Sequence, residues 1–316
     1  MVILAALASG LAVADPPVIK KLGTIDCDLV ETTPVVFHGK LYRFEYVREN
    51  YKRNQTGKSY FRFMDAASGQ PTPSFAMGYH LGCAYVEGET VYAYGVDRWG
   101  GETIQAFRST DLGKWSSQEA IRLPGWGIYN TSVCKSDSDY VMAIEIGEPP
   151  EEVGVRFTIR FARSKDLLNW QITPSDCVYA RDKYTACPAL RFVDGWFYMI
   201  YLEAKPGPRY APHIVRSTDL VHWESGITNP IMEPSDEDKR VANPRLTVYQ
   251  REHIAKAANV NNSDVDFCDV GDRTVIYYSW GNQQGTEFLA EAVYEGSSAS
   301  LLRSCFLSAE TRDNLP

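Results

Sequence analysis

Four acidic residues, spread over most of the chain, have the chemistry that is easiest to relate to a reaction. Glu31, Glu145, Glu203 and Asp264 each lie at an end of a short apolar run that a tight turn joins to another run. A pair of carboxyl groups can cleave a glycosidic bond, because one donates a proton to the leaving oxygen while the other activates water or attacks. Crowding carboxylates together also raises the pKa of one of them, as an acid catalyst requires. We therefore predict these four as catalytic residues, with Glu31 and Glu203 as the leading acid/base pair.

Polar and aromatic residues occupy equivalent positions in the other runs, where they could bind a sugar. A tryptophan ring followed by amides suits sugar binding, since the ring stacks on the apolar face of the sugar and the amides bond its hydroxyls. The predicted substrate-binding residues are His80, Asp97, Arg98, Asn130, Trp280, Asn282 and Gln283. Each has a structural alternative: a lone histidine is usually structural, Asp97 and Arg98 could form a local ion pair, and Glu145 could pair with a neighbouring cation.

The segment 261–266 is unusually polar for the start of a buried strand, and two of its residues could hold a metal. Asp264 and Asp266 are two residues apart, which in a regular strand places both side chains on one face. Carboxylate oxygens are ligands that Ca²⁺ prefers, so we predict a divalent-cation site there. The alternative is a turn rich in Asn and Asp that bonds its own backbone.

An internal repeat indicates how these residues are positioned. The segment 108–115 reads Arg-Ser-Thr-Asp-Leu-Gly-Lys-Trp, and related segments recur at 163–170 and 216–223. Their aspartates are 55 and 53 residues apart, and a period near 50 in an all-β pattern is typical of a β-propeller. The aspartate can bond nearby amides in a turn and the tryptophan can pack between blades, so we interpret these markers as scaffold.

Between the markers, five stretches of chain each read as a β-hairpin with Gly or Asp at the turn. They cover 35–44, 84–94, 132–144, 189–200 and 265–278. We expect each hairpin to form the two inner strands of a blade, which gives an all-β, five-bladed β-propeller. The starts of the first strands and the ends of the second strands then meet on one face, where the acidic residues would gather. Residues 249–258 interrupt the pattern as a short helix or an irregular insert, either a lid or a surface loop.

Composition and the N-terminus limit the compartment and the partners. The net charge is −8 and no Lys/Arg run occurs, which argues against a nucleic-acid partner. Residues 1–14 are apolar, too short to span a bilayer, and end in Ala-Val-Ala, so we predict a signal-peptide remnant and a secreted or periplasmic protein. An ordinary strand or helix is the alternative. Residues 15–316 then form a single propeller domain, and seven cysteines without a CxxC pair make a structural zinc site improbable.

Taken together, the markers and the hairpins resemble the five-bladed propeller glycoside hydrolases of families 43, 32 and 117 and their relatives, over residues 24–300. The resemblance implies one carboxylate from the first inner strand, one from the third and an acid from the fourth. Glu31 fits the first position. Asn130 stands at the third, and Ala186 and Cys187 stand at the fourth, so Glu203, Glu145, Asp264 or His80 would have to substitute.

These observations favour an exo-acting glycoside hydrolase that acts on oligosaccharides derived from plant or algal polysaccharides. Two alternatives stay open. One is a propeller that binds carbohydrate without turnover, through Trp280 and the amides that follow it. The other is a related glycoside phosphorylase, which needs cations at the mouth to bind phosphate. Arg48, Arg98 and Arg209 are the candidates for that role.

Overall fold

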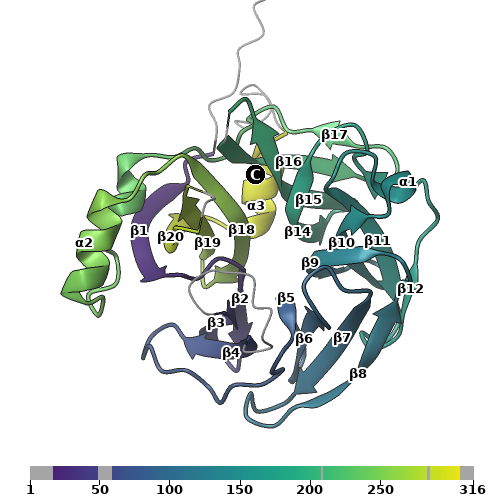
Figure 1. Cartoon of the computed structure of the whole chain (residues 1–316), viewed down its shortest axis with the longest axis horizontal. Helices are drawn as coiled ribbons and strands as arrows, with labels where there is room; N and C mark the ends of the chain where they lie inside the picture. Colours follow the sequence, from purple (N-terminus) through teal and green to yellow (C-terminus); the bar gives the residue numbers. More distant parts are fainter. Residues whose placement is uncertain (1–16, 49–58, 208, 283–284, 307–316) are drawn as a thin grey trace, which may run out of the picture.

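Five antiparallel sheets follow one another around a central axis in the computed structural model (Figure 1). The structure describes residues 17–48, 59–207, 209–282 and 285–306. This arrangement confirms the predicted all-β, five-bladed propeller. The predicted signal remnant, residues 1–14, lies outside the described residues and stays a prediction.

The first four blades follow the chain in order, each with its first strand innermost. The first blade contains β2 (Thr32–Phe37), β3 (Lys40–Val47) and β4 (Tyr60–Asp65). The second contains β5 (His80–Glu87), β6 (Thr90–Val96), β7 (Thr103–Ser109) and β8 (Ser116–Arg122). The third contains β9 (Gly127–Lys135), β10 (Tyr140–Glu148), β11 (Thr158–Ser164) and β12 (Trp170–Ile172), with β13 (Val178–Tyr179) also on β11. The fourth contains β14 (Thr185–Val193), β15 (Trp196–Lys205), β16 (Arg209–Ser217) and β17 (Glu224–Ser225).

The fifth blade combines both ends of the chain, which the sequence analysis did not predict. It contains β18 (Asn261–Val270), β19 (Arg273–Gly281) and β20 (Glu287–Tyr294), and its outermost strand is β1 (Lys20–Cys27). Each of the five predicted hairpins forms the two inner strands of its blade, as expected. The pairing of β1 with β20 closes the ring.

The three sequence markers form the same structure in three blades. In each, the Asp carboxylate accepts hydrogen bonds from the amides two and three residues later, and the Ser hydroxyl accepts from the Asp and Leu amides. The tryptophan then packs on the preceding blade. Trp115 stacks on Phe75 at 3.8 Å, Trp170 lies against Tyr94, and Trp223 stacks on Phe161. The predicted scaffold role is confirmed.

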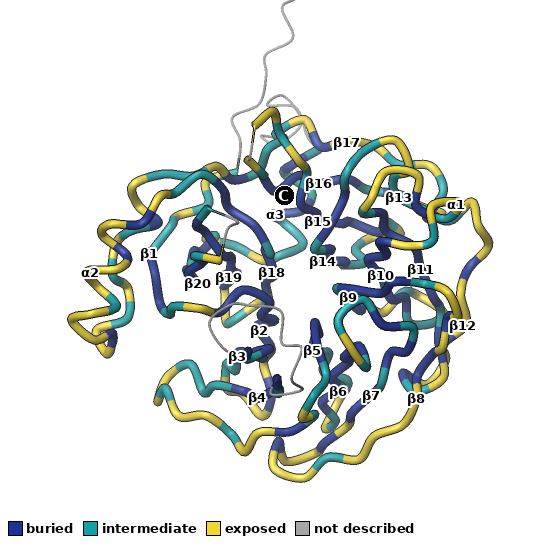
Figure 2. Tube along the Cα trace, viewed as in Figure 1, coloured by how far each residue is buried: buried dark blue, intermediate teal, exposed yellow. Residues whose placement is uncertain are grey.

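Apolar residues fill the spaces between blades rather than the outer surface (Figure 2). The helices are short and peripheral: α1 (Pro150–Val153), the 3-10 helix η2 (Asp236–Lys239), α2 (Val248–Lys256) and α3 (Ser298–Ser304). The predicted helix in 249–258 is α2, and it lies at the outer edge beside β1, away from the axis (Figure 1). None of the described helices is both long and apolar enough to cross a membrane.

The Asp166→Ala substitution tests the marker turn in the third blade. Asp166 accepts hydrogen bonds from the Asn169 side chain and from the Asn169 and Leu168 backbone amides, and these bonds outweigh the effect of burial and hold its pKa at about 2. We expect the variant to lose about 1–2 kcal/mol of unfolding free energy at neutral pH, by analogy with helix caps. Because the folded-state pKa is depressed, this loss should vanish as pH falls from about 4 to 2. Denaturant unfolding of the wild type, Asp166→Ala and Asp166→Asn at pH 7 and at pH 2 measures this loss of unfolding free energy. An equal deficit at pH 7 and pH 2 would contradict the assignment.

Candidate functional site

Three of the four predicted catalytic carboxyl groups lie at one end of the central channel. Glu31 precedes β2, Glu145 lies in β10 and Asp264 lies in β18, so they come from the first, third and fifth blades. We call these three residues, with Asn130 and Cys187, the acidic mouth. A small pocket of about 30 Å³ opens there. Its lining includes Glu31, Thr32, Gly82, Asn130, Cys187, Pro188, Asp264 and Asp266.

Glu145 is the most deeply placed carboxyl group of the acidic mouth. Its side chain is almost fully buried, and its Oε2 accepts hydrogen bonds from the Cys187 amide at 2.7 Å and from Asn130 Nδ2 at 3.0 Å. Burial raises the pKa of Glu145 to about 7, against the opposing effect of these two bonds, and the charges of Asp264 and Glu31 add to the rise. The carboxyl group can therefore hold or release a proton near neutral pH.

Glu31 lies on the opposite side of the mouth, also with little exposure. Its Oε1 is 3.5 Å from Nη2 of Arg48, whose guanidinium lies over the rings of Tyr46 and Trp99. Burial is the main cause that raises the pKa of Glu31, and the charge of Asp264 contributes, while Arg48 opposes the rise. Among the described residues, the charges of Glu31, Glu145 and Asp264 act on one another in this region, so these carboxyl groups do not ionise independently.

Backbone irregularities bring Cys187 and Asp264 to the mouth. Each lies in a β-bulge of an innermost strand and has a positive φ, 50° in both cases. Such bulges re-aim a side chain and are common next to active sites. Asp264 also accepts a hydrogen bond from the Ser279 hydroxyl at 3.2 Å. The bulge breaks the two-residue alternation on which the prediction of a shared face for Asp264 and Asp266 depended.

Glu203 lies in a different electrostatic environment, in β15 opposite Thr185. Its carboxylate accepts hydrogen bonds from Lys183 at 2.9 Å, Tyr201 at 2.7 Å and Lys205 at 3.4 Å. Burial acts to raise the pKa of Glu203, but the bonds from Lys183 and Tyr201 outweigh it and hold the pKa at about 2. An ionised carboxylate cannot donate a proton at neutral pH, so these contacts do not suit Glu203 as the acid of the predicted pair.

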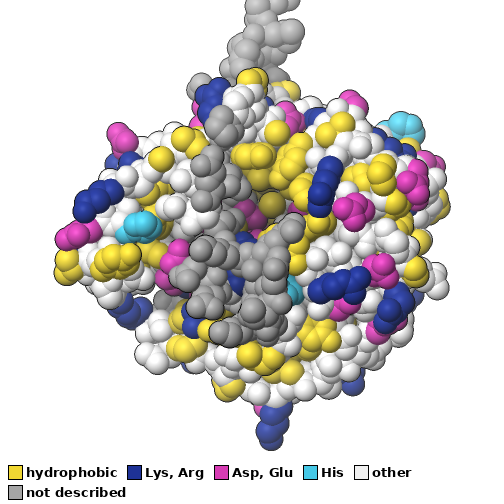
Figure 3. Space-filling view, viewed as in Figure 1, with side chains coloured by type: hydrophobic (Ala, Val, Ile, Leu, Met, Phe, Trp, Pro, Cys, Tyr) yellow, Lys and Arg dark blue, Asp and Glu magenta, His cyan; other side chains and the backbone are white. Residues whose placement is uncertain are grey.

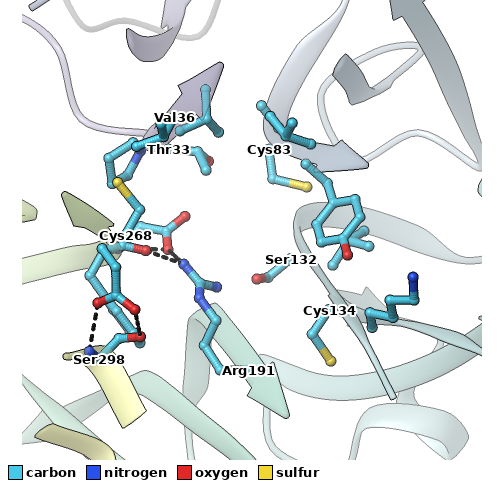
Figure 4. A pocket seen from close by; sticks show the side chains of 18 of the residues that line it. Thr33, Val36, Cys83, Ser132, Cys134, Arg191, Cys268 and Ser298 are labelled. Carbon is cyan, nitrogen blue, oxygen red and sulfur yellow. Dashed lines mark hydrogen bonds and ion pairs between the residues drawn. The ribbon is translucent and has the colours of Figure 1, made fainter. Parts of the chain in front are cut away.

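Asp266 of the fifth blade forms an ion pair with an arginine from the neighbouring fourth blade. Arg191 Nη2 lies 2.5 Å from Asp266 Oδ1, and the guanidinium stacks on Phe267. This pair separates the acidic mouth from a cavity of about 290 Å³ at the other end of the channel, into which Cys83, Cys134 and Cys268 project (Figure 4). Among the residues that the structure describes, no group of three His, Cys, Asp or Glu side chains is arranged to hold a metal ion. The divalent-cation site stays a prediction.

His80, Asp97 and Arg98 lie on the second blade, and none of them lines the pocket of the mouth. His80 is buried, and its Nδ1 shares a 2.7 Å hydrogen bond with Tyr46. Burial, followed by the charge of Arg48, lowers the pKa of His80. Asp97 pairs with the exposed Arg98 and accepts a bond from the Thr103 amide, which is the local ion pair that the sequence left open.

Trp280 does not have the environment of a sugar platform. Its side chain is fully buried, stacks on Phe288 at 4.4 Å, and donates a hydrogen bond to the Thr24 hydroxyl at 2.9 Å. The indole ring belongs to the core of the fifth blade, and the prediction that it stacks on substrate is corrected. Asn282 follows β19, and its backbone amide donates a hydrogen bond to the carbonyl of Thr286. Gln283 lies outside the described residues.

Sequence reasoning missed a row of aromatic side chains beside the mouth, which we call the aromatic arc. Consecutive ring centroids are 6.2 Å apart for Trp99 and Tyr129, 4.7 Å for Tyr129 and Phe157, 5.7 Å for Phe157 and Tyr184, and 5.4 Å for Tyr184 and Tyr210. Four of the five rings are partly exposed. In the space-filling view, hydrophobic side chains gather near β15 and β16, and acidic and basic side chains both show near the centre of the face (Figure 3). No fixed spacing distinguishes these rings from core aromatics in the sequence.

No protein-family model and no curated protein matches this sequence. Solved structures do share its fold. A thermostable family-43 glycoside hydrolase is 11% identical with a TM-score of 0.60, over 88% of this chain and 93% of that chain. A xylan β-1,4-xylosidase from Bacillus halodurans is 12% identical with a TM-score of 0.55, over 87% of this chain and 54% of that chain. An N-acetylgalactosamine deacetylase from F. plautii is 12% identical with a TM-score of 0.57, over 94% and 97%. At these identities the likeness shows the fold, a five-bladed propeller with glycoside hydrolases among its structural neighbours.

Comparing Glu145→Gln with the wild type across pH tests the protonation of the buried carboxyl. The folded-state pKa of about 7 lies above the ordinary 4.5, so folding holds a proton that the unfolded chain releases in this interval. Wild-type stability should therefore fall between pH 4.5 and 7, and the difference between variant and wild type should move by about 3 kcal/mol in favour of Glu145→Gln. Denaturant unfolding at several pH values measures it, and a difference that stays constant would contradict the protonated Glu145.

Proposed function

We propose that the protein is a glycoside hydrolase in which Glu145 donates the proton and Glu31 activates the attacking water. The observation that carries this proposal is a buried carboxyl group with a pKa of about 7, beside two other carboxyl groups at the mouth of a propeller channel. Enzymes that cleave glycosidic bonds need one carboxyl protonated and another ionised in the same site.

The contacts of Glu145 suit a proton donor. Once the proton has passed to the leaving oxygen, the remaining charge lies on a carboxylate that already accepts bonds from the Cys187 amide and from Asn130. Such bonds stabilise the ionised form, so proton transfer leaves no unpaired buried charge. Burial keeps the proton on the group before the reaction begins.

Burial raises the pKa of Glu31 and Arg48 opposes this rise, so the guanidinium favours the ionised form that a base requires while Glu145 holds the proton. The pocket bounded by Glu31 and Asp264 has a volume of about 30 Å³, which is enough for water and too small for a sugar. A water there would lie next to the carboxylate that takes its proton, while the sugar lies above it beside the aromatic arc. Asp264 would help to fix the water and the sugar hydroxyls.

Action at a chain end is the mode that the channel supports. Arg191 and Asp266 close the channel directly beneath the pocket, so a glycan could enter the mouth only from one side. A mouth that is closed on its inner side favours the terminal sugar of a chain over the middle of a polymer. The oligosaccharide source, plant or algal, remains part of the proposal.

The phosphorylase alternative requires cations that gather around one phosphate. Arg48 contacts Glu31, Arg98 pairs with Asp97 outside the mouth, and Arg209 lines a separate crevice. The three arginines of that hypothesis thus have different environments. The non-catalytic alternative assigned sugar binding to Trp280, which is buried. The aromatic arc could stack on the sugar in its place.

A panel of aryl glycosides and oligosaccharides, assayed with and without phosphate and chelator, tests the proposed activity. We expect phosphate-independent hydrolysis by the wild type, and a fall in kcat of about 10²–10⁴ in both Glu31→Gln and Glu145→Gln. For Glu145→Gln the loss should be smaller on aryl glycosides, whose leaving groups need less protonation. Steady-state kinetics with reducing-sugar detection measures these effects.

Glu224→Gln is the matched control, because Glu224 is exposed on β17 and pairs only with Arg216 among the described residues. It should keep wild-type kinetics. Full activity in Glu145→Gln together with loss in Glu203→Gln would instead support the originally predicted Glu31 and Glu203 pair. Glycan binding without any turnover would overturn the hydrolase proposal in favour of a binding propeller.

A further inference from the structure

A crevice of about 510 Å³ lies between the fourth and fifth blades, apart from the acidic mouth. The end of β15 supplies Lys205, and the start of β16 supplies Arg209 and Tyr210. The segment that links the two blades supplies Pro230 and Glu233, and Asn259 comes from the residues just before β18. The crevice is large enough for a sugar unit, whereas the pocket beneath the acidic mouth, at about 30 Å³, has room only for water, so a sugar at the mouth lies above that pocket.

Buried bonds fix the linker wall of this crevice. The side chain of Asn229 accepts from the Ile214 amide and donates to the Ile214 carbonyl, and the Ile231 amide donates to Pro212. Pro230 is therefore held against β16 between two anchored residues. Preorganised walls of this kind reduce the entropy that a ligand must overcome on binding.

The fifth-blade wall depends on a buried ion pair. Lys21 Nζ lies 2.8 Å from Asp238 Oδ1, and it also donates to the carbonyl of Glu233. Asn259 Nδ2 donates to Asp238 Oδ2 at 2.8 Å. The same pair thus positions Glu233 and Asn259, the two residues with acceptor groups on this side of the crevice.

Tyr210 connects the crevice to the acidic mouth. Its ring lies 5.4 Å from that of Tyr184 and ends the aromatic arc. Burial raises the pKa of the Tyr184 hydroxyl, and the charges of Cys187 and Glu145 contribute, which places Tyr184 beside the mouth. Two neighbouring units of one glycan could therefore occupy the mouth and the crevice at once.

The polar groups of the crevice suit the hydroxyl groups of a neutral sugar better than a charged ligand. Among described residues, the Arg209 guanidinium bonds only the Pro206 carbonyl, through Nε, which leaves its terminal nitrogens for a ligand. Glu233 is exposed and supplies an acceptor. Lys205 is already engaged by Glu203 and His213. A donor, an acceptor and an aromatic ring around one space match the two faces of a sugar.

From this geometry we infer that the crevice is a second sugar-binding subsite, which holds a neutral unit of the oligosaccharide through stacking on Tyr210 and bonds to Arg209 and Glu233. This inference rests on the proposed glycoside hydrolase activity and specifies its substrate: an oligosaccharide of at least two units rather than a monoglycoside. It predicts that added chain length improves binding through the crevice.

The test uses the glycan that the wild type cleaves best in the panel above, as the aryl monoglycoside and as the di-, tri- and tetrasaccharide. For the wild type, kcat/KM should rise at least tenfold from the monoglycoside to the longer substrates. Tyr210→Ala and Arg209→Gln should lose most of this rise, and Arg209→Gln, which lies outside the aromatic arc, should keep wild-type kinetics on the monoglycoside. Tyr249→Ala is the matched control, since Tyr249 is an exposed tyrosine on α2, and it should behave as the wild type.

Calorimetric titration of Glu145→Gln with the same series separates binding from chemistry. Tighter binding of longer glycans, reduced by Tyr210→Ala, supports the subsite. Equal affinity at all lengths, or a Tyr210→Ala variant that keeps the full length dependence, overturns the subsite and leaves the hydrolase proposal intact. A marked preference for acidic over neutral glycans of equal length overturns its neutral character. A wild type that neither binds nor cleaves any panel member overturns both proposals.

Discussion

The pairing of β1 with β20 is the constraint on which the candidate site depends. Glu31 is the fourth residue after β1, and Asp264 lies in the blade that β1 completes. Their carboxyl groups are close enough to influence each other only because the first and last parts of the chain share a blade. Without this pairing, the first and fifth blades would meet only through packing contacts such as those of β2 with β18 and β19.

Buried polar contacts hold this seam together. Thr24 of β1 accepts a hydrogen bond from Trp280 and donates one to the carbonyl of Asp238, whose carboxylate pairs with Lys21. A buried ion pair stabilises little by itself, but removing one partner leaves an unpaired charge and is costly. The tryptophan that the sequence presented as a ligand platform therefore contributes to closing the ring. The same Lys21–Asp238 pair also positions a wall of the crevice between the fourth and fifth blades.

Much of the fold could be predicted because it repeats. The spacing of the markers near 50 residues and the five hairpins follow from local rules, namely turn residues and alternating burial, which act within each blade. The closure by β1 could not be predicted in this way, since it joins residues more than 250 positions apart.

The residues of the candidate site were harder to predict than the fold. Counting residues from each turn identified Glu31 and Glu145, but a bulge with positive φ at Asp264 shifts the register that such counting assumes. Glu203 fitted the count as well as Glu145, and only the cations around it reveal its low pKa.

The innermost strands of the third and fourth blades carry no acid at the mouth, and a carboxyl group from another strand takes that place. The resemblance to glycoside hydrolases implies carboxylates where Asn130 and Cys187 stand. In this chain, Asn130 Nδ2 and the Cys187 amide both donate to the same oxygen of Glu145, which comes from the second strand of the third blade. A carboxyl group thus reaches the space between the two positions from a neighbouring strand. Its position depends on donors in two blades, and replacing Asn130 would remove one of them and alter the pKa of Glu145 without changing the carboxyl itself. The chemistry of such a site follows from which strand supplies the charge and which supply its hydrogen bonds, and a shared fold does not determine either.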